Sequence, residues 1–109
     1  MGKPKSDLLH GTLELLVLQL LENEAMNGYG IGRRIEELTQ DALSVDEGSL
    51  YPALYRMERR GWLKSSWGVS ENNRRAKFYK ITRTGRTRLE SESANWMSFA
   101  AAVEKILGA

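Results

Sequence analysis

Cysteine is absent from this 109-residue sequence, and histidine occurs only once. Without cysteine the chain has no disulfide bond, no thiolate metal site and no thiol nucleophile, which fits a cytoplasmic protein. An enzyme would need a nucleophile with its base or a cluster of metal ligands. The lone His10 is most simply a surface or capping residue, and the acids are scattered. We therefore expect no catalytic residue, no metal site and no cofactor.

Long apolar runs are missing as well. The most apolar stretch, residues 13–21, contains Glu14 and Gln19 and is far shorter than the roughly 20 residues that cross a bilayer. No targeting or membrane segment is visible, so we expect no membrane partner. A single domain of this length buries a limited core, which makes association with a second copy a natural source of stability.

Acidic residues are scarce in one part of the chain. Residues 56–88 contain eleven Lys or Arg and two acids, a local charge of +9, so the rest of the chain carries −7 of the total of +2. This split predicts a local basic surface, and the alternative is a solvated charged face.

The segment 46–63 reads as a helix with two chemically different sides when its residues are placed about 100° apart. One side is apolar and carries Leu50, Ala53, Leu54 and Met57. The other side has no carboxylate and carries Ser49, Pro52, Tyr55, Arg56 and Arg59. This second side suits docking on a polyanion.

The boundaries of this helix follow from its proline and its glycine. We expect the helix to begin at residues 47–49, so that Pro52 lies in the first turn, where a missing N–H has no helical partner. The dipole and the free N–H groups of that end favour phosphate near Tyr51. Gly61 ends the helix.

Two further helices are expected before this one. The first begins at Leu8 and is apolar on two sides, because Leu15 and Leu18 project away from its main stripe. A helix of this kind in a small chain indicates a dimer surface. A second helix begins near Asn27, a suitable N-cap.

After Gly61 the pattern predicts a hairpin of two strands, residues 62–69 and 75–82. Arg74, Arg75 and Lys77 lie at or beside its tip, where long cationic side chains reach a groove or a backbone. Thr82 then opens a last helix that runs to about Leu107 and extends beyond the domain. Its heptad seam consists of Leu89, Trp96, Phe99, Val103 and Ile106.

The order of elements predicts a mainly α fold with a two-stranded β-wing. We expect a flexible arm at 1–7, a winged helix-turn-helix domain at 8–82 and a C-terminal dimerisation helix at 83–109. In such folds the helix before the wing enters the major groove of DNA, and a two-fold dimer matches an inverted repeat. The last helix pairs with a second copy through the seam, with Leu15 and Leu18 as the complementary surface, or else folds back on its own domain.

Four stretches resemble the signature blocks of the PadR family of bacterial transcriptional regulators. They are GYGI at 28–31, GSLYPAL at 48–54, LYRMERRG at 54–61 and RAKFYKITRTG at 75–85. The resemblance covers about residues 8–107, and the short C-terminal region is similar to the compact subgroup with a single terminal helix. Two positions depart from the family pattern: Gly32 replaces a larger residue, and Phe78 stands where Tyr is more usual.

The resemblance implies a dimeric transcriptional repressor that binds double-stranded DNA. Its terminal helix packs on the partner's first helix. The resemblance places Ser49, Tyr51, Pro52 and Tyr55 on the groove-facing segment, and it matches the basic wing to Arg74, Arg75 and Lys77. Some members of that family release DNA when an aromatic or phenolic compound, or a hydrophobic drug, enters a cavity at the dimer interface. Trp96 resembles the tryptophan that flanks this cavity, and it either contacts such an effector or simply fills the interface.

The alternative function is a winged-helix module that binds an acidic protein without specific DNA binding. Salt dependence separates the two, because a DNA binder with several phosphate contacts loses affinity steeply as salt rises.

Overall fold

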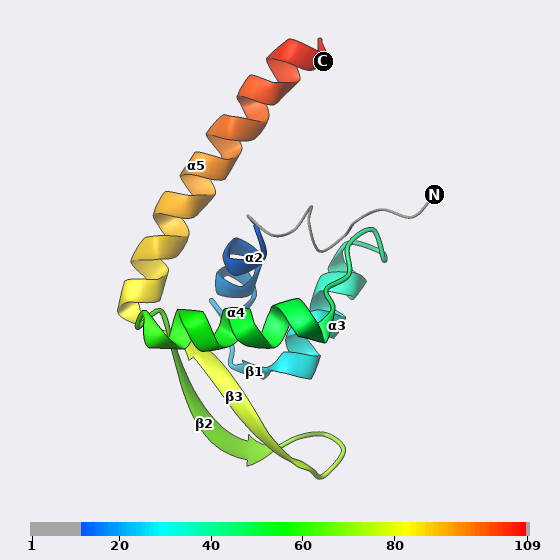
Figure 1. The fold of residues 1–109 in the computed structure, drawn as a ribbon, viewed down its shortest axis with the longest axis vertical. Coiled ribbons are helices and arrows are strands. Elements are labelled where there is room, and N and C mark those ends of the chain that lie inside the picture. The colour runs from blue at the N-terminus through cyan, green and yellow to red at the C-terminus, as the bar shows by residue number, and fades with distance from the viewer. Residues whose placement is uncertain (1–11, 109) are drawn as a thin grey trace.

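The computed structural model describes residues 12–108 and contains four helices and three strands within them (Figure 1). In chain order these are α2 (Leu13–Leu20), β1 (Met26–Asn27), α3 (Gly28–Leu38), α4 (Glu47–Arg59), β2 (Leu63–Val69), β3 (Arg75–Ile81) and α5 (Arg83–Leu107). The arm expected at 1–7, Leu8 and His10 lie outside the described residues. The mainly α winged helix-turn-helix architecture with a C-terminal helix is confirmed.

The core lies where α2, α3 and α4 meet the base of the hairpin. The apolar face predicted for α4 is confirmed, because Leu50, Ala53, Leu54 and Met57 are all buried. They pack with Val17 of α2 and with the other apolar side chains of the core cluster. No polar or charged residue is buried among residues 12–108. The chemistry of the molecule is therefore on its surface.

Three helices begin with a side chain that caps a free backbone N–H group. Asn27 Oδ1 accepts from the Gly30 amide at 2.8 Å, which confirms the predicted start of α3. Asp46 Oδ1 accepts from the Ser49 amide at 2.8 Å at the start of α4. At the start of α5, Thr82 Oγ1 accepts from the Gly85 amide at 3.0 Å. Each such cap contributes about 1 kcal/mol.

The C-terminal end of α4 directs the chain into the hairpin. Gly61 has a φ of +81°, the left-handed conformation that glycine adopts without strain. Its N–H donates to the Glu58 carbonyl, and the Trp62 N–H donates to the Met57 carbonyl, both at 3.0 Å. This is the Schellman arrangement of a helix end. It confirms Gly61 as the terminator of α4.

The expected position of Pro52 in the first turn of α4 is wrong. Pro52 lies inside the helix, in its second turn. The hydrogen bond that a proline cannot donate would have reached the Gly48 carbonyl. Gly48 is exposed in the first turn, where water can bond to that carbonyl in place of the missing N–H. The helix therefore continues through the proline.

The sheet has three antiparallel strands in the order β1-β3-β2, where two had been expected. The wing, which we define as β2, β3 and the turn 70–74, pairs in continuous register from Leu63 with Ile81 to Val69 with Arg75. The missed strand, β1, is only two residues long and pairs Met26 with Tyr79. So short a strand has no alternation of apolar and polar residues to reveal it. It joins the start of α3 to the wing.

The first part of α5 belongs to the domain, and the rest extends away from it (Figure 1). Leu89 is buried in the core, and α5 packs against α2 and β3. Beyond it, an apolar stripe is exposed on the single chain, and it consists of Trp96, Phe99, Val103 and Ile106. The helix does not fold back on its own domain. No helix within residues 12–108 is long and apolar enough to cross a membrane.

Two residues expected on the dimer surface lie in the core of the single chain instead. Leu18 is 1% exposed and Leu89 is 5% exposed. The reason is that α2 contacts α3, α4 and α5 at once, so a helix that is apolar on two sides is already covered within one chain. Leu15 is half-buried and packs at the edge of the core.

Candidate nucleic-acid interface

The surface of α4 opposite the core carries the polar side predicted from the sequence. Tyr51, Pro52, Tyr55, Arg56 and Arg59 are exposed. Ser49, the remaining residue of that side, is half-buried, and its amide is used by the Asp46 cap. The exposed side chains therefore lie along the middle and the C-terminal half of the helix.

Tyr55 and Arg59 form a pair one helical turn apart. The Arg59 Nη1 donates to the Tyr55 hydroxyl at 3.2 Å, and its guanidinium lies 5.6 Å from the centre of the Tyr55 ring. Among residues 12–108, no carboxylate forms an ion pair with Arg59 or a hydrogen bond with Tyr55. A guanidinium has five N–H donors, so Arg59 retains donors for a guanine edge or a phosphate. This pair is an exposed hydrogen-bonding group on α4.

The N-terminal end of α4 does not offer the expected phosphate site. Asp46 caps the Ser49 amide, and Glu47 places a second carboxylate in the first turn. Carboxylates at a helix N-terminus already interact with the positive end of the dipole and would repel a phosphate. The expectation was wrong because it considered the helix backbone without these two acids.

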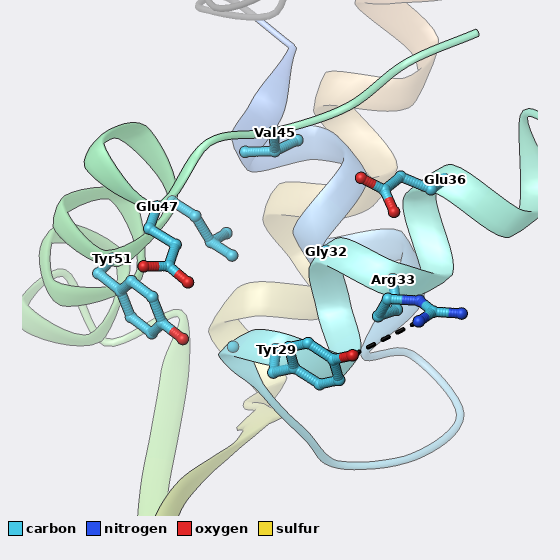
Figure 2. Close-up of a pocket in the computed structure, with 9 residues that line it drawn as sticks. Tyr29, Gly32, Arg33, Glu36, Val45, Glu47 and Tyr51 are labelled. Atoms are coloured by element: carbon cyan, nitrogen blue, oxygen red, sulfur yellow. Dashed lines mark hydrogen bonds between the residues drawn. The ribbon is translucent and has the colours of Figure 1, made fainter. Parts of the chain in front are cut away.

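A cleft of about 220 Å³ lies beside this end, between α3 and α4. Figure 2 shows Tyr51 and Glu47 on one side of the cleft, and Tyr29, Arg33 and Glu36 on the other. The ring of Tyr51 lies against Gly28, where an added Cβ would overlap the ring. Tyr51 therefore covers the junction of the two helices.

Burial raises the pKa of the Tyr51 phenol, and the Glu47 carboxylate adds to the rise. Burial also raises the pKa of the Tyr79 phenol, on β3 beneath the helix. A free tyrosine already titrates near 10. Both phenols therefore keep their proton at neutral pH.

Arg56 has a carboxylate beside it, contrary to the prediction for this side of the helix. Its Nη2 lies 3.6 Å from Glu14 Oε2, and Arg60 Nη1 lies 3.9 Å from the same oxygen. Glu14 belongs to α2. Arg56 is thus drawn toward α2, and it is a weaker candidate for a base contact than Arg59.

The two arginines of the wing differ in their surroundings, because Arg75 stacks on an aromatic ring and Arg74 lies at the tip. The register puts Trp67 opposite Lys77 and Val69 opposite Arg75, so these four side chains share one face of the sheet. The Arg75 guanidinium stacks over the Trp67 ring at 4.5 Å, and Trp67 is 59% exposed. Such stacking holds a guanidinium in place while its N–H donors stay available. Arg74, at the tip, is exposed.

Lys77 lies nearer the helix and has a carboxylate partner. Its Nζ is 3.5 Å from Glu58 Oε1, and the other oxygen of Glu58 accepts from Ser65 Oγ at 2.6 Å. Glu58 had not been expected at the interface, because the helical projection gives no information on contacts with strands. The exposed stack of Trp67 with Arg75 was not predicted from the sequence.

Known proteins resemble this chain in sequence and in fold. Residues 17–91 match the family model described as "Transcriptional regulator PadR-like family". A transcriptional regulator from Clostridium thermocellum has a similar structure, with 29% identity and a TM-score of 0.83 over 92% of this chain and 97% of that chain. A PadR-like regulator from Bacillus cereus has 28% identity and a TM-score of 0.79 over 95% and 99% of the two chains. An uncharacterised protein from Lysinibacillus sphaericus is 26% identical over 92 residues, 84% of each chain.

Proposed function

Because this chain belongs to the PadR-like family of transcriptional regulators, which are not enzymes, we propose that it is a dimeric repressor that binds an inverted-repeat operator in the cytoplasm. The observation that supports this most is the combination of an exposed Tyr55–Arg59 pair on α4 with a cationic wing directly after it. A helix followed by a wing is a geometry in which the helix enters the major groove.

The helix and the wing have different parts in the proposal. Pro52, Tyr55 and Arg59 face the bases, and Arg59 makes the bidentate contact with guanine that arginine prefers. Ser49 and Tyr51 belong to the same groove-facing segment and lie nearer the N-terminal end of α4. Arg74 and Arg75 contact phosphates or the adjacent minor groove, and they contribute affinity that does not depend on sequence.

The dimer forms through the exposed stripe of α5. Trp96, Phe99, Val103 and Ile106 lie on one side of a helix that leaves its own domain. In a two-fold dimer each stripe packs on the partner, where the half-buried Leu15 of α2 is part of the receiving surface. The two α4 helices then lie about one helical turn of DNA apart, roughly 34 Å, which requires an inverted repeat.

An effector at the dimer interface remains a prediction. Trp96 is partly exposed on the single chain and belongs to the same stripe. Its indole stacks on a flat aromatic compound or packs on the partner. Tryptophan fluorescence in the presence of phenolic compounds would distinguish these, with Trp96→Phe as the control that removes the signal of this residue.

Selection of bound sequences from a pool of random duplexes tests the function. The proposal predicts enrichment of a two-fold symmetric site, and Arg59→Ala removes the preference at the guanine that Arg59 reads. Recovery of no common sequence, with weak binding to all duplexes, would favour the alternative of a winged-helix module that binds an acidic protein.

A further inference from the structure

A single carboxylate joins α4 to both strands of the wing. Glu58 lies in the last turn of α4. One of its oxygens accepts from Ser65 Oγ on β2 at 2.6 Å, and the other lies 3.5 Å from Lys77 Nζ on β3. The side chain of Glu58 is 31% exposed and that of Lys77 is 38% exposed. The cluster is therefore at the surface, in the angle between the helix and the sheet.

The strand register explains how one side chain reaches two strands. Ser65 pairs with Tyr79, and Trp67 pairs with Lys77. Ser65 and Lys77 are thus diagonal neighbours on the same face of the sheet. The Schellman turn at Gly61 fixes where α4 ends, but it lies at the base of the wing. Glu58 makes a further contact between α4 and the wing. This contact is at Ser65, two residues beyond the start of β2 at Leu63.

The negative charge of Glu58 weakens binding to DNA, whereas the positive charges of the wing strengthen it. A carboxylate near a DNA backbone repels the phosphates, and it competes with them for the Lys77 ammonium. A phosphate at Lys77 shares the ammonium with Glu58 or displaces it, and in both cases the carboxylate stays close to the phosphate. Lys77 therefore contributes less to the binding of random DNA than an unpaired lysine in the same place.

We propose that Glu58 is a specificity-determining residue: it holds the wing in the position that fits an operator and withholds Lys77 from the DNA backbone. The first effect favours the operator over other sites. The second lowers the affinity for DNA of any sequence, so that tight binding depends more on the contacts that read the operator. The inference rests on the proposed DNA binding.

Glu58→Gln tests the charge, because glutamine has the same shape and keeps an acceptor for Ser65. The variant should bind a random-sequence duplex several-fold more tightly than the native protein. The slope of log affinity against log salt concentration should steepen by about 0.9 for each copy of Lys77 in the dimer that contacts a phosphate. Glu90→Gln is the matched control, since Glu90 is an exposed acid on α5, away from the wing. It should leave the slope unchanged.

Two further variants separate the parts of the proposal. In a Lys77→Gln background, Glu58→Gln should no longer tighten random binding, because the released ammonium is gone. Ser65→Ala keeps the ion pair but removes the bond to β2, so it should weaken operator binding and leave random binding unchanged. Circular dichroism of each variant checks that the fold is retained.

Equal effects of Glu58→Gln and Glu90→Gln on random DNA would overturn the proposal, as would a gain that persists without Lys77. If the native protein binds neither operator nor random duplexes, the proposed function has failed. The positioning by Glu58 is then decided by amide chemical shifts of the free protein. Glu58→Gln and Ser65→Ala should shift the amides of β2 and β3 when Glu90→Gln does not, and shifts confined to the mutated residue would refute the positioning role.

Discussion

The exposed stripe of α5 leads to a quantitative prediction for Phe99→Ala. Phe99 keeps 66% of its surface exposed on the single chain, although it lies in the stripe with Trp96 and Val103. Full burial of such a side chain contributes about 1.5–3 kcal/mol, so burial of the exposed two-thirds contributes about 1–2 kcal/mol. A two-fold dimer contains the residue twice, which makes the loss about 2–4 kcal/mol.

This loss corresponds to an increase of about 30- to 1000-fold in the dissociation constant of the dimer. Sedimentation velocity over a dilution series measures that constant directly. The matched control is Met97→Ala, because Met97 is 67% exposed on the same helix but points away from the stripe. Its dissociation constant should stay close to the native value.

Two results would refute the argument for the stripe. If Phe99→Ala and Met97→Ala weaken the dimer equally, the contact is not made by one side of the helix. If neither variant changes the dissociation constant, α5 is not the dimer interface. Val103→Glu gives a second test of the same surface, since a buried charge without a partner should leave the chain monomeric.

Other substitutions test the interface and the fold. Arg59→Ala should weaken operator binding and relax specificity, whereas Arg75→Ala should weaken binding to all duplexes alike, and equal losses on operator and random DNA for both would contradict this division. Gly85→Ala should lower the free energy of unfolding by about 1–3 kcal/mol, because the added Cβ would overlap the Trp62 carbonyl oxygen. An unchanged free energy in denaturant unfolding would show that α5 can shift to make room. Asn27→Ala should lower the free energy of unfolding by about 1 kcal/mol in the same assay. Asn27→Asp is the conservative control that retains the cap.

The features that were predicted correctly from the sequence are mostly local. A cap is formed between residues three apart, as at Asn27 and Thr82, so the sequence around the helix start contains the whole interaction. Gly61 likewise ends α4 through bonds to the residues just before it. The burial of one face of α4 followed from periodicity, because a single core covers that face.

The features that were missed depend on contacts between distant segments. Leu18 resembles a surface residue when α2 is considered alone, and it is buried because three other helices surround α2. Glu14 and Glu58 reduce the basic character of α4 and the wing by pairing with Arg56 and Lys77. A count of charges along the chain cannot show which cations are already paired. The candidate interface is therefore smaller than the basic segment, and Arg59 and Arg75 are its best-supported members.

The most direct test of the account is the affinity of the purified protein for its selected inverted repeat and for a scrambled duplex of the same length, measured from about 50 to 200 mM salt. The account predicts that both affinities fall linearly on a log–log plot, with the inverted repeat bound at least about 1000-fold more tightly at each salt concentration. Equal affinities for the two duplexes, or an affinity that does not change with salt, would contradict the proposal that α4 and the wing read DNA.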